Sequence, residues 1–315
     1  MVFRSKIERL EKSEAGILDS FDIEYSQKFV KILFQDSQIN TISVEGGRQL
    51  QNPIVLIHGF GAGLALWGVA IKPLTSLQDV HAFDLLGFAK SSRPNFSEDF
   101  RVAESEMVES VEMWRNAMNL EKMNIVAHSF GGYLATSYAI KYPHRVEKLV
   151  LVDPWGFNER LDMTKAPNIL PVGGLLMKLY DKCNPLLILR VIGFFNTKLI
   201  QRIRPDLQET YSESVYEYVY LCNAREPTGE KAFKNLTIKM NWAKSPMIHR
   251  FDTLDPKIQV TFIHGSKSWI EYKSTSRLFE LDHVNQHVIE GAGHHVYADN
   301  TLEFNEIVIK ALTKI

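Results

Sequence analysis

The stretch "NIVAHSFGGYLATSYAIKYP", residues 124–143, decides the fold because one serine separates two different patterns in it. An apolar run typical of a buried strand precedes Ser129, and small and apolar residues typical of a helix follow it as far as Pro143. A strand that turns sharply into a helix at a serine is typical of a nucleophile elbow, with the usual pattern G-x-S-x-G. The pattern here is A-H-S-F-G, and Ala127 and Gly131 are small enough for that turn.

Apolar strands and helices alternate on both sides of this turn. Strands are expected within "FVKILFQ" (29–35), "INTISVE" (39–45), "PIVLIHGFGAG" (53–63), "VHAFDLLGFAKSS" (80–92) and "EKLVLVDP" (147–154). The stretch 103–120 predicts an amphipathic helix, because apolar residues such as Met107 and Val111 recur on one face. This alternation predicts an α/β fold with a mostly parallel central sheet and helices on both faces.

The alternation stops after Pro154 and resumes at "PKIQVTFIHG" (256–265), and the sequence between them is helical and rich in Leu, Phe and Tyr. We therefore expect an α/β core of residues 25–155 and 251–315, interrupted by a helical cap insertion of residues 156–250. An insertion at this point lies over the carboxyl ends of the strands, where ligands bind in open α/β sheets.

Two parts of the chain carry apolar faces for which the sequence allows two partners. Residues 1–24 form a predicted amphipathic segment, with Leu10 and Ile17 on one face, which can bind a lipid interface or dock against the body of the protein. In the cap, "ILPVGGLLMKLY" (169–180) and "PLLILRVIGFF" (185–195) can pack inside the cap or face an acyl chain or a bilayer surface.

The composition argues against several classes of function. The chain has 36 Lys and Arg against 37 Asp and Glu, so no strong positive charge favours nucleic acid. It carries no P-loop or dinucleotide fingerprint and no metal-ligand spacing of histidines, so no cofactor and no metal are expected. The N-terminal residues are too charged for a secretory signal, no apolar run reaches the length of about 18 residues that a membrane span needs, and two cysteines imply no disulfide framework. We expect an intracellular, cytoplasmic protein.

Two further loops supply groups that acyl transfer needs. Backbone amides must stabilise the oxyanion, and the glycine-rich loop "HGFGAG" (58–63) is expected to offer the Phe60 amide beside the Phe130 amide of the elbow. A general base is expected from "GAGHHVYAD" (291–299), which follows the last strand. We favour His294 over its neighbour, His295, because the first histidine of the loop lies nearer the sheet.

The acid that orients the histidine has two candidates. The usual chain order is serine, acid, histidine, and the acid ends a strand. Glu271 lies in the loop after the penultimate strand and is preferred. Asp153 ends the strand after the elbow and is the alternative, although an Asp-Pro pair also commonly begins a turn.

Several motifs together resemble one known group, the α/β-hydrolase-domain four/five subfamily. They are "HGFGAGLALW", "FDLLGFAKSSRP", "AHSFGGYLATSYAIKYPHRVEKLVLVDPWGF", "FKNLTIKMNWAKSPM" and "GAGHHVYAD". The resemblance implies the α/β-hydrolase fold and a triad of Ser129, Glu271 and His294, with aspartate as the usual acid in the subfamily. It also implies an H-x4-D acyltransferase motif from His294 to Asp299, for which a role at the following helix start is the favoured alternative.

The same resemblance implies three functions. The subfamily contains a lysophospholipase that acts on N-acyl phosphatidylethanolamines and a catalytically silent activator of triglyceride lipase, in which asparagine replaces the nucleophile. This chain keeps Ser129, has Lys267 in place of the activator's arginine, and has no tryptophan before Trp67 that could serve as the droplet anchor. We therefore expect a serine hydrolase of lipid esters, acting on a lysophospholipid, N-acyl phospholipid or glycerolipid. The alternatives are an activator of a partner lipase at lipid droplets or membranes, and a lysophosphatidic acid acyltransferase.

Overall fold

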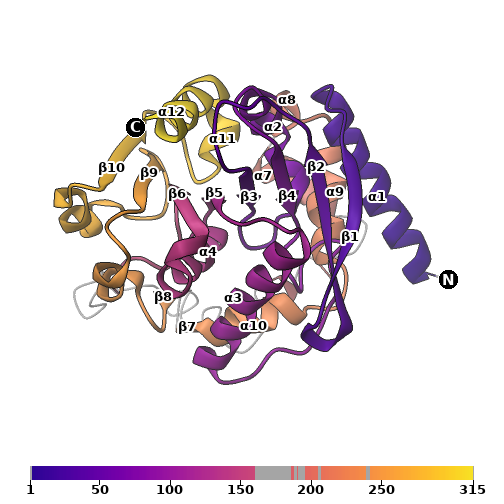
Figure 1. The fold of residues 1–315 in the computed structure, drawn as a ribbon. Coiled ribbons are helices and arrows are strands. Elements are labelled where there is room, and N and C mark those ends of the chain that lie inside the picture. The colour runs from indigo at the N-terminus through magenta and orange to yellow at the C-terminus, as the bar shows by residue number, and fades with distance from the viewer. Residues whose placement is uncertain are drawn as a thin grey trace, which may run out of the picture.

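The central element is an eight-stranded sheet in the order β1-β2-β4-β3-β5-β6-β9-β10 (Figure 1). The computed structural model describes residues 2–159, 186–187, 190, 196–204, 207–238 and 242–314. The strands are β1 Ser26–Ile32, β2 Ser37–Val44, β3 Ile54–Ile57, β4 Val80–Phe83, β5 Met123–His128, β6 Val146–Val152, β9 Gln259–Gly265 and β10 Val284–Ile289. The strand β2 is antiparallel to both β1 and β4, and the remaining pairs are parallel. The predicted mostly parallel sheet is confirmed.

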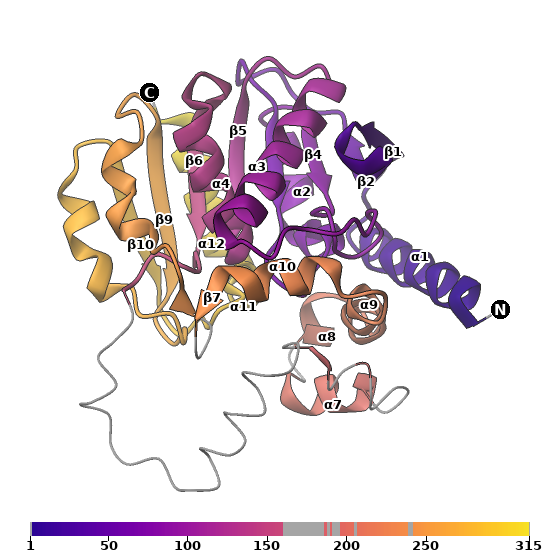
Figure 2. The same ribbon diagram turned by 90° about the horizontal axis from the view of Figure 1, so that it is seen from below.

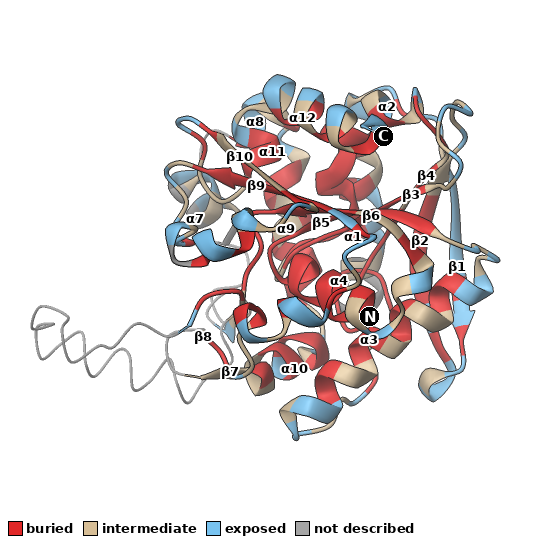
Figure 3. Ribbon diagram, turned by 60° about the vertical axis from the view of Figure 1, so that its left-hand side comes forward, coloured by how far each residue is buried: buried red, intermediate tan, exposed pale blue. Residues whose placement is uncertain are grey.

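Alternation along the central strands divides the core into two parts. In β3, Val55 and Ile57 join the cluster on one face, while Ile54 and Leu56 join the cluster on the other. Both faces are therefore apolar, as a parallel sheet covered by helices on both sides requires. Buried residues concentrate in the strands and on the inner sides of the helices (Figure 3).

The helices that cover the sheet come from the predicted segments. Helices α3 Phe100–Ala117 and α4 Phe130–Lys141 contribute to one cluster, and α2 Gly68–Thr75, α11 Val296–Asp299 and α12 Thr301–Thr313 contribute to the other. Helix α3 begins where the Asp99 side chain accepts hydrogen bonds from the amides of Arg101 and Val102. Its buried face carries Met107 and Val111, as the spacing predicts.

The N-terminal helix α1, Val2–Ser20, docks against the body of the protein. Leu10 and Ile17 are fully buried, and the helix packs beside α9, Ser214–Asn223 (Figure 1). Glu14 is buried with Lys90 at 2.9 Å, and burial raises the pKa of Glu14 to about 7. The sequence allowed this apolar face either a lipid interface or the body of the protein. The structure shows Leu10 and Ile17 docked against the body of the protein.

The segment between β6 and β9 supplies four described helices, α7 Asn196–Ile203, α8 Leu207–Thr210, α9 and α10 Thr228–Leu236. They lie together below the sheet in Figure 2. A two-stranded ribbon, β7 Thr237–Ile238 with β8 Trp242–Ala243, follows them. The division into core and cap stays a prediction. The apolar segment 169–180 and most of 185–195 lie outside the described residues.

Within the described ranges, no helix combines the length and apolar character that crossing a membrane requires.

Candidate active site

Ser129 lies at a strained turn between β5 and α4. Its backbone has φ 52° and ψ −118°, in a region that few residues with a side chain adopt. The Ser129 amide donates to the Val152 carbonyl of the adjacent strand, and the Ser129 carbonyl accepts from the Trp155 amide. The strand ladder therefore fixes the backbone that presents the serine hydroxyl.

Close backbone packing explains why two positions around the serine are glycine. A Cβ atom at Gly131 would lie 2.4 Å from the carbonyl oxygen of His58, and one at Gly59 would lie 2.9 Å from the Ser129 Cβ. The first contact is with backbone that cannot move aside, so the small residue two positions after the serine is a requirement of the fold. The second brings the loop after β3 directly against Ser129.

His58 fixes this glycine loop. Its Nδ1 lies 2.8 Å from the Gly59 carbonyl oxygen and its Nε2 lies 2.9 Å from the Leu85 amide nitrogen. The ring therefore donates through Nδ1 and accepts through Nε2, which is the neutral form. Burial lowers the pKa of His58 and keeps it neutral.

His294 connects the serine to a carboxylate. Its Nε2 lies 3.0 Å from Ser129 Oγ and its Nδ1 lies 2.6 Å from Asp153 Oδ2. The three residues come from the ends of β5 and β6 and from the loop after β10. This is the serine–histidine–acid geometry of nucleophilic catalysis.

Asp153 is kept ionised by His294 and Ser268, which contact its Oδ2, and by the more distant His264. It is completely buried, and burial alone would raise the pKa of its carboxyl. The imidazoles of His264 and His294 and the hydroxyl of Ser268 outweigh burial and lower the pKa of Asp153 below its ordinary value. The His264 Nδ1 lies 3.5 Å from Asp153 Oδ1, a long contact, while Ser268 Oγ donates to Oδ2. An ionised carboxylate therefore faces His294.

The preference for Glu271 as the acid is wrong in this geometry. Both ring nitrogens of His294 are engaged by Ser129 and Asp153. The exposed Glu271 side chain accepts the Lys273 amide at 2.8 Å in its own turn. The sequence argument favoured the later strand because Asp-Pro suits a turn. However, β6 pairs directly with β5, which brings its end beside Ser129.

Two other histidines, His128 and His295, pack against the His294 ring. His128 Nε2 donates to the His294 carbonyl at 2.9 Å and so holds its backbone. Burial and the neighbouring His294 lower the pKa of His128 to about 3, so this donor is neutral. His295 accepts from the Arg204 guanidinium at 3.1 Å, and burial lowers its pKa well below the usual value.

Asp299, the last residue of the H-x4-D motif, contacts the Gly293 amide and Arg204. Its Oδ2 accepts the Gly293 amide at 2.7 Å, and its Oδ1 pairs with Arg204 at 2.9 Å. The start of α12 is capped by Asn300, whose side chain accepts the Glu303 amide. Asp299 therefore bridges the His294 loop and the segment that carries Arg204.

Sequence reasoning did not find Ser268 or Trp269, which follow β9. Ser268 supports Asp153, and the Trp269 ring lies 5.2 Å from the His294 ring with 65% of its surface exposed. Both residues come three or four positions after a predicted strand end, and this is the signal that could have identified them. Phe130 is the first residue of α4, and Phe60 follows Gly59 in the loop after β3. Their role as oxyanion donors stays a prediction.

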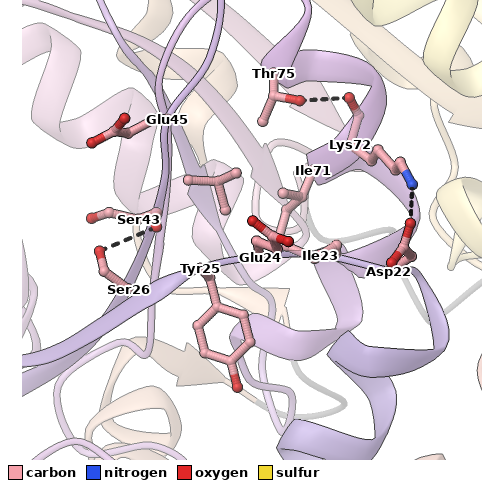
Figure 4. Close-up of a pocket in the computed structure, with 11 residues that line it drawn as sticks. Asp22, Ile23, Glu24, Tyr25, Ser26, Ser43, Glu45, Ile71, Lys72 and Thr75 are labelled. Atoms are coloured by element: carbon pink, nitrogen blue, oxygen red, sulfur yellow. Dashed lines mark hydrogen bonds and ion pairs between the residues drawn. The ribbon is translucent and has the colours of Figure 1, made fainter.

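One cavity of the structure lies away from this site. It has a volume of about 590 Å³ and is lined by residues around the start of β1 and the end of β2, including the Asp22–Lys72 pair at 2.8 Å (Figure 4). It also borders Ile71 and Thr75 of α2, just before β4 begins, whereas Ser129 follows the carboxyl end of β5. This cavity is therefore separate from the site. In the described part of the chain, no cluster of three His, Cys, Asp or Glu side chains could hold a metal ion.

The fold and this arrangement define the class of protein. Residues 52–301 match the family described as the alpha/beta hydrolase fold, and the chain belongs to this family. A crystal structure of carboxylesterase CesB from Bacillus subtilis shares the fold, with a TM-score of 0.71 and 15% identity over 98% of each chain.

Three relatives place the chain within the family. It is 52% identical to abhydrolase domain-containing protein abhd-5.2 of Caenorhabditis elegans, over 98% of this chain and 70% of that protein. It is 42% identical to 1-acylglycerol-3-phosphate O-acyltransferase ABHD5 of Rattus norvegicus, over 95% of this chain and 88% of that protein. It is 39% identical to (lyso)-N-acylphosphatidylethanolamine lipase of Bos taurus, over 96% of this chain and 91% of that protein. The resemblance to the four/five subfamily is confirmed.

Proposed function

We propose that the protein is a serine hydrolase of lipid esters, with Ser129, His294 and Asp153 as its catalytic triad. The observation that carries the proposal is the continuous contact from Ser129 Oγ through both nitrogens of His294 to Asp153. An ordinary buried serine does not need a histidine in hydrogen-bond contact that is itself oriented by a buried carboxylate.

Each group has one role in this mechanism. Ser129 Oγ attacks the ester carbonyl while His294 Nε2 takes its proton, and His294 then gives that proton to the leaving alcohol. Asp153 accepts the Nδ1–H of His294 and stabilises the ring when it becomes charged. The amides of Phe60 and Phe130 stabilise the oxyanion, and water then releases the acyl group by the same proton transfers.

A lipid ester as substrate is supported by the names of relatives. One relative is named as a lipase of lyso-N-acylphosphatidylethanolamine and another as an acyltransferase of 1-acylglycerol-3-phosphate. Both names describe the transfer of a fatty acyl group from or to a glycerophospholipid. A lysophospholipid or an N-acyl phospholipid is therefore the substrate class that we propose. Peripheral association with a membrane or lipid droplet would bring the protein to such a substrate.

Labelling by a fluorophosphonate probe tests the proposed nucleophile. We expect the folded protein to be labelled at Ser129, because His294 activates this hydroxyl and the site can hold a tetrahedral adduct. Mass spectrometry of the digested protein identifies the labelled residue. Heat-denatured protein is the control, since labelling that persists after unfolding is not caused by the site. A folded protein that remains unlabelled at Ser129 contradicts the proposal.

Acyl transfer to an acylglycerol phosphate is a second candidate, favoured by the name of the ABHD5 relatives. It shares the acyl-enzyme on Ser129 and differs only in using an alcohol acceptor in place of water. Product analysis with acyl-CoA and lysophosphatidic acid separates the two functions. If transfer occurs, phosphatidic acid forms in the wild type and is lost in Ser129→Ala. Release of free fatty acid without phosphatidic acid excludes it.

A further inference from the structure

A second cavity lies beside the glycine loop and is almost wholly apolar. It has a volume of about 200 Å³. Its walls include Phe60, Ala62, Leu66, Ile200, Leu207 and Val219. These residues come from the loop after β3 and from α7, α8 and α9, so the cavity lies between the sheet and the described part of the predicted cap.

The cavity begins next to the catalytic residues. Gly59 packs against the Ser129 side chain, and the next two residues of that loop, Phe60 and Gly61, line the cavity. His295, the neighbour of His294, lines it as well. A group bound to Ser129 with its carbonyl oxygen toward the Phe60 amide therefore has this cavity close by.

The size and lining of the cavity favour hydrocarbon over water. An apolar cavity of about 150 Å³ can stay dry and bind a small hydrocarbon, because water there would lose its hydrogen bonds. The present cavity is of similar size, and the polar groups at its edge are engaged. The Asn223 side chain donates to the Gly61 and Val219 carbonyls, and Tyr211 donates to the Leu66 carbonyl.

Arg204 closes one side of the cavity. The same residue lines a separate cavity of about 470 Å³, together with Thr210, Gly293 and Asp299, so it stands between the two. Its guanidinium is fixed by Asp299 at 2.9 Å and by His295 at 3.1 Å, and its carbonyl accepts from the Tyr216 hydroxyl. Asp299 is in turn fixed by the Gly293 amide.

We propose that the apolar cavity binds the acyl chain of the substrate and that Arg204, held by Asp299, forms its closed end. This inference rests on the proposed function. A methyl terminus cannot pass a paired guanidinium without breaking the ion pair or desolvating it, so the pair limits the acyl length. In this proposal the aspartate of the H-x4-D motif is a positioning residue that acts through Arg204.

A larger side chain on α7 that fills the cavity tests whether the acyl chain binds there. Ile200→Phe places a ring in the cavity, whereas Lys198→Phe places the same ring on the exposed side of the same helix. We measure kcat/KM for p-nitrophenyl acetate, butyrate, octanoate and palmitate. Ile200→Phe is expected to lower the octanoate-to-acetate ratio about tenfold, the effect of one or two lost methylene contacts. Lys198→Phe is expected to keep the wild-type ratio, and equal ratios in all three proteins overturn the proposal.

Opening the closed end tests the role of Arg204. Arg204→Met removes the charge and joins the two cavities, so the preferred ester is expected to become longer. Asp299→Asn weakens the hold on Arg204 and is expected to change chain preference in the same direction, with a smaller effect. A uniform loss of activity with every ester in both variants means that the pair only supports the fold, which also overturns the proposed limit.

A binding measurement separates failure of this inference from failure of the proposed function. Ser129→Ala protein is titrated with a dansyl-labelled fatty acid, whose fluorescence rises in an apolar site. Ile200→Phe and Lys198→Phe are each added to the Ser129→Ala background. If only Ile200→Phe weakens binding while the wild type lacks esterase activity, the cavity binds an acyl chain and the proposed hydrolysis is wrong. Equal binding by Ser129→Ala and by its two double variants shows that the cavity does not bind the acyl chain.

Discussion

Replacing Ser129 by alanine is expected to abolish hydrolysis of lysophospholipid and p-nitrophenyl esters, lowering kcat on the order of 10⁴-fold or more. The loss is large because the other members of the site have no role in covalent catalysis without the nucleophile, so their contributions disappear with it. The measurement is steady-state release of fatty acid and of p-nitrophenol by purified wild type and variant. The largest rate difference is expected for esters whose chain fits the site.

The control for Ser129→Ala is the integrity of the fold. Ser129 is 6% exposed, and alanine removes one hydroxyl without adding volume, so the thermal midpoint is expected to stay close to that of the wild type. A variant that folds normally and retains the wild-type rate contradicts the triad. The activator alternative is tested in the same preparations. If Ser129→Ala still stimulates a triglyceride lipase and the wild type has no esterase activity, the protein acts through a partner.

Replacing Asp153 by asparagine is expected to lower kcat/KM by about 10³-fold to 10⁴-fold, while Glu271→Gln remains close to the wild type. The amide of asparagine cannot stabilise a charged His294, and it can hold the ring in the tautomer that presents a hydrogen to Ser129. The Glu271 carboxylate contacts its own turn, so loss of its charge leaves His294 in place. The two variants are assayed side by side with one ester across a range of pH.

The comparison distinguishes a catalytic effect from a structural one. Asp153 is buried and accepts from Ser268, so its variant can also lose stability. Ser268→Ala removes this second contact while leaving the carboxylate on His294, and it is expected to retain far more activity than Asp153→Asn. Equal losses in the two variants indicate a packing role for Asp153. A loss in Glu271→Gln alone restores Glu271 as the acid.

Much of the architecture could be predicted because it depends on local pattern. Apolar alternation in β3 supplies both faces of the sheet, and helical spacing in α3 supplies its buried face. The turn at Ser129 was predicted from its small neighbours, and the 2.4 Å approach at Gly131 gives the physical reason for one of them. His294 was placed by its position after the last strand. These features need only the residue and its immediate surroundings.

The choice of acid was outside the reach of such patterns. Asp153 and Glu271 both follow strands, and chain order admits either one. The decision depends on strand pairing, because β5 and β6 are neighbours and the end of β6 therefore meets the serine and the histidine. The position of α1 is a similar case, since the apolar face that carries Leu10 and Ile17 suits a membrane surface as well as the apolar cluster in which it is buried.

The sequence by itself therefore determined the strands, the turn at Ser129 and the two loops that face it, because hydrophobic spacing and residue size control local backbone. Only the tertiary structure decided that Asp153 meets His294 and that Asp299 meets Arg204. Each pair joins parts of the chain more than ninety residues apart. Such contacts depend on the order of strands and the packing of helices across the sheet, and the local sequence around each residue does not indicate its partner.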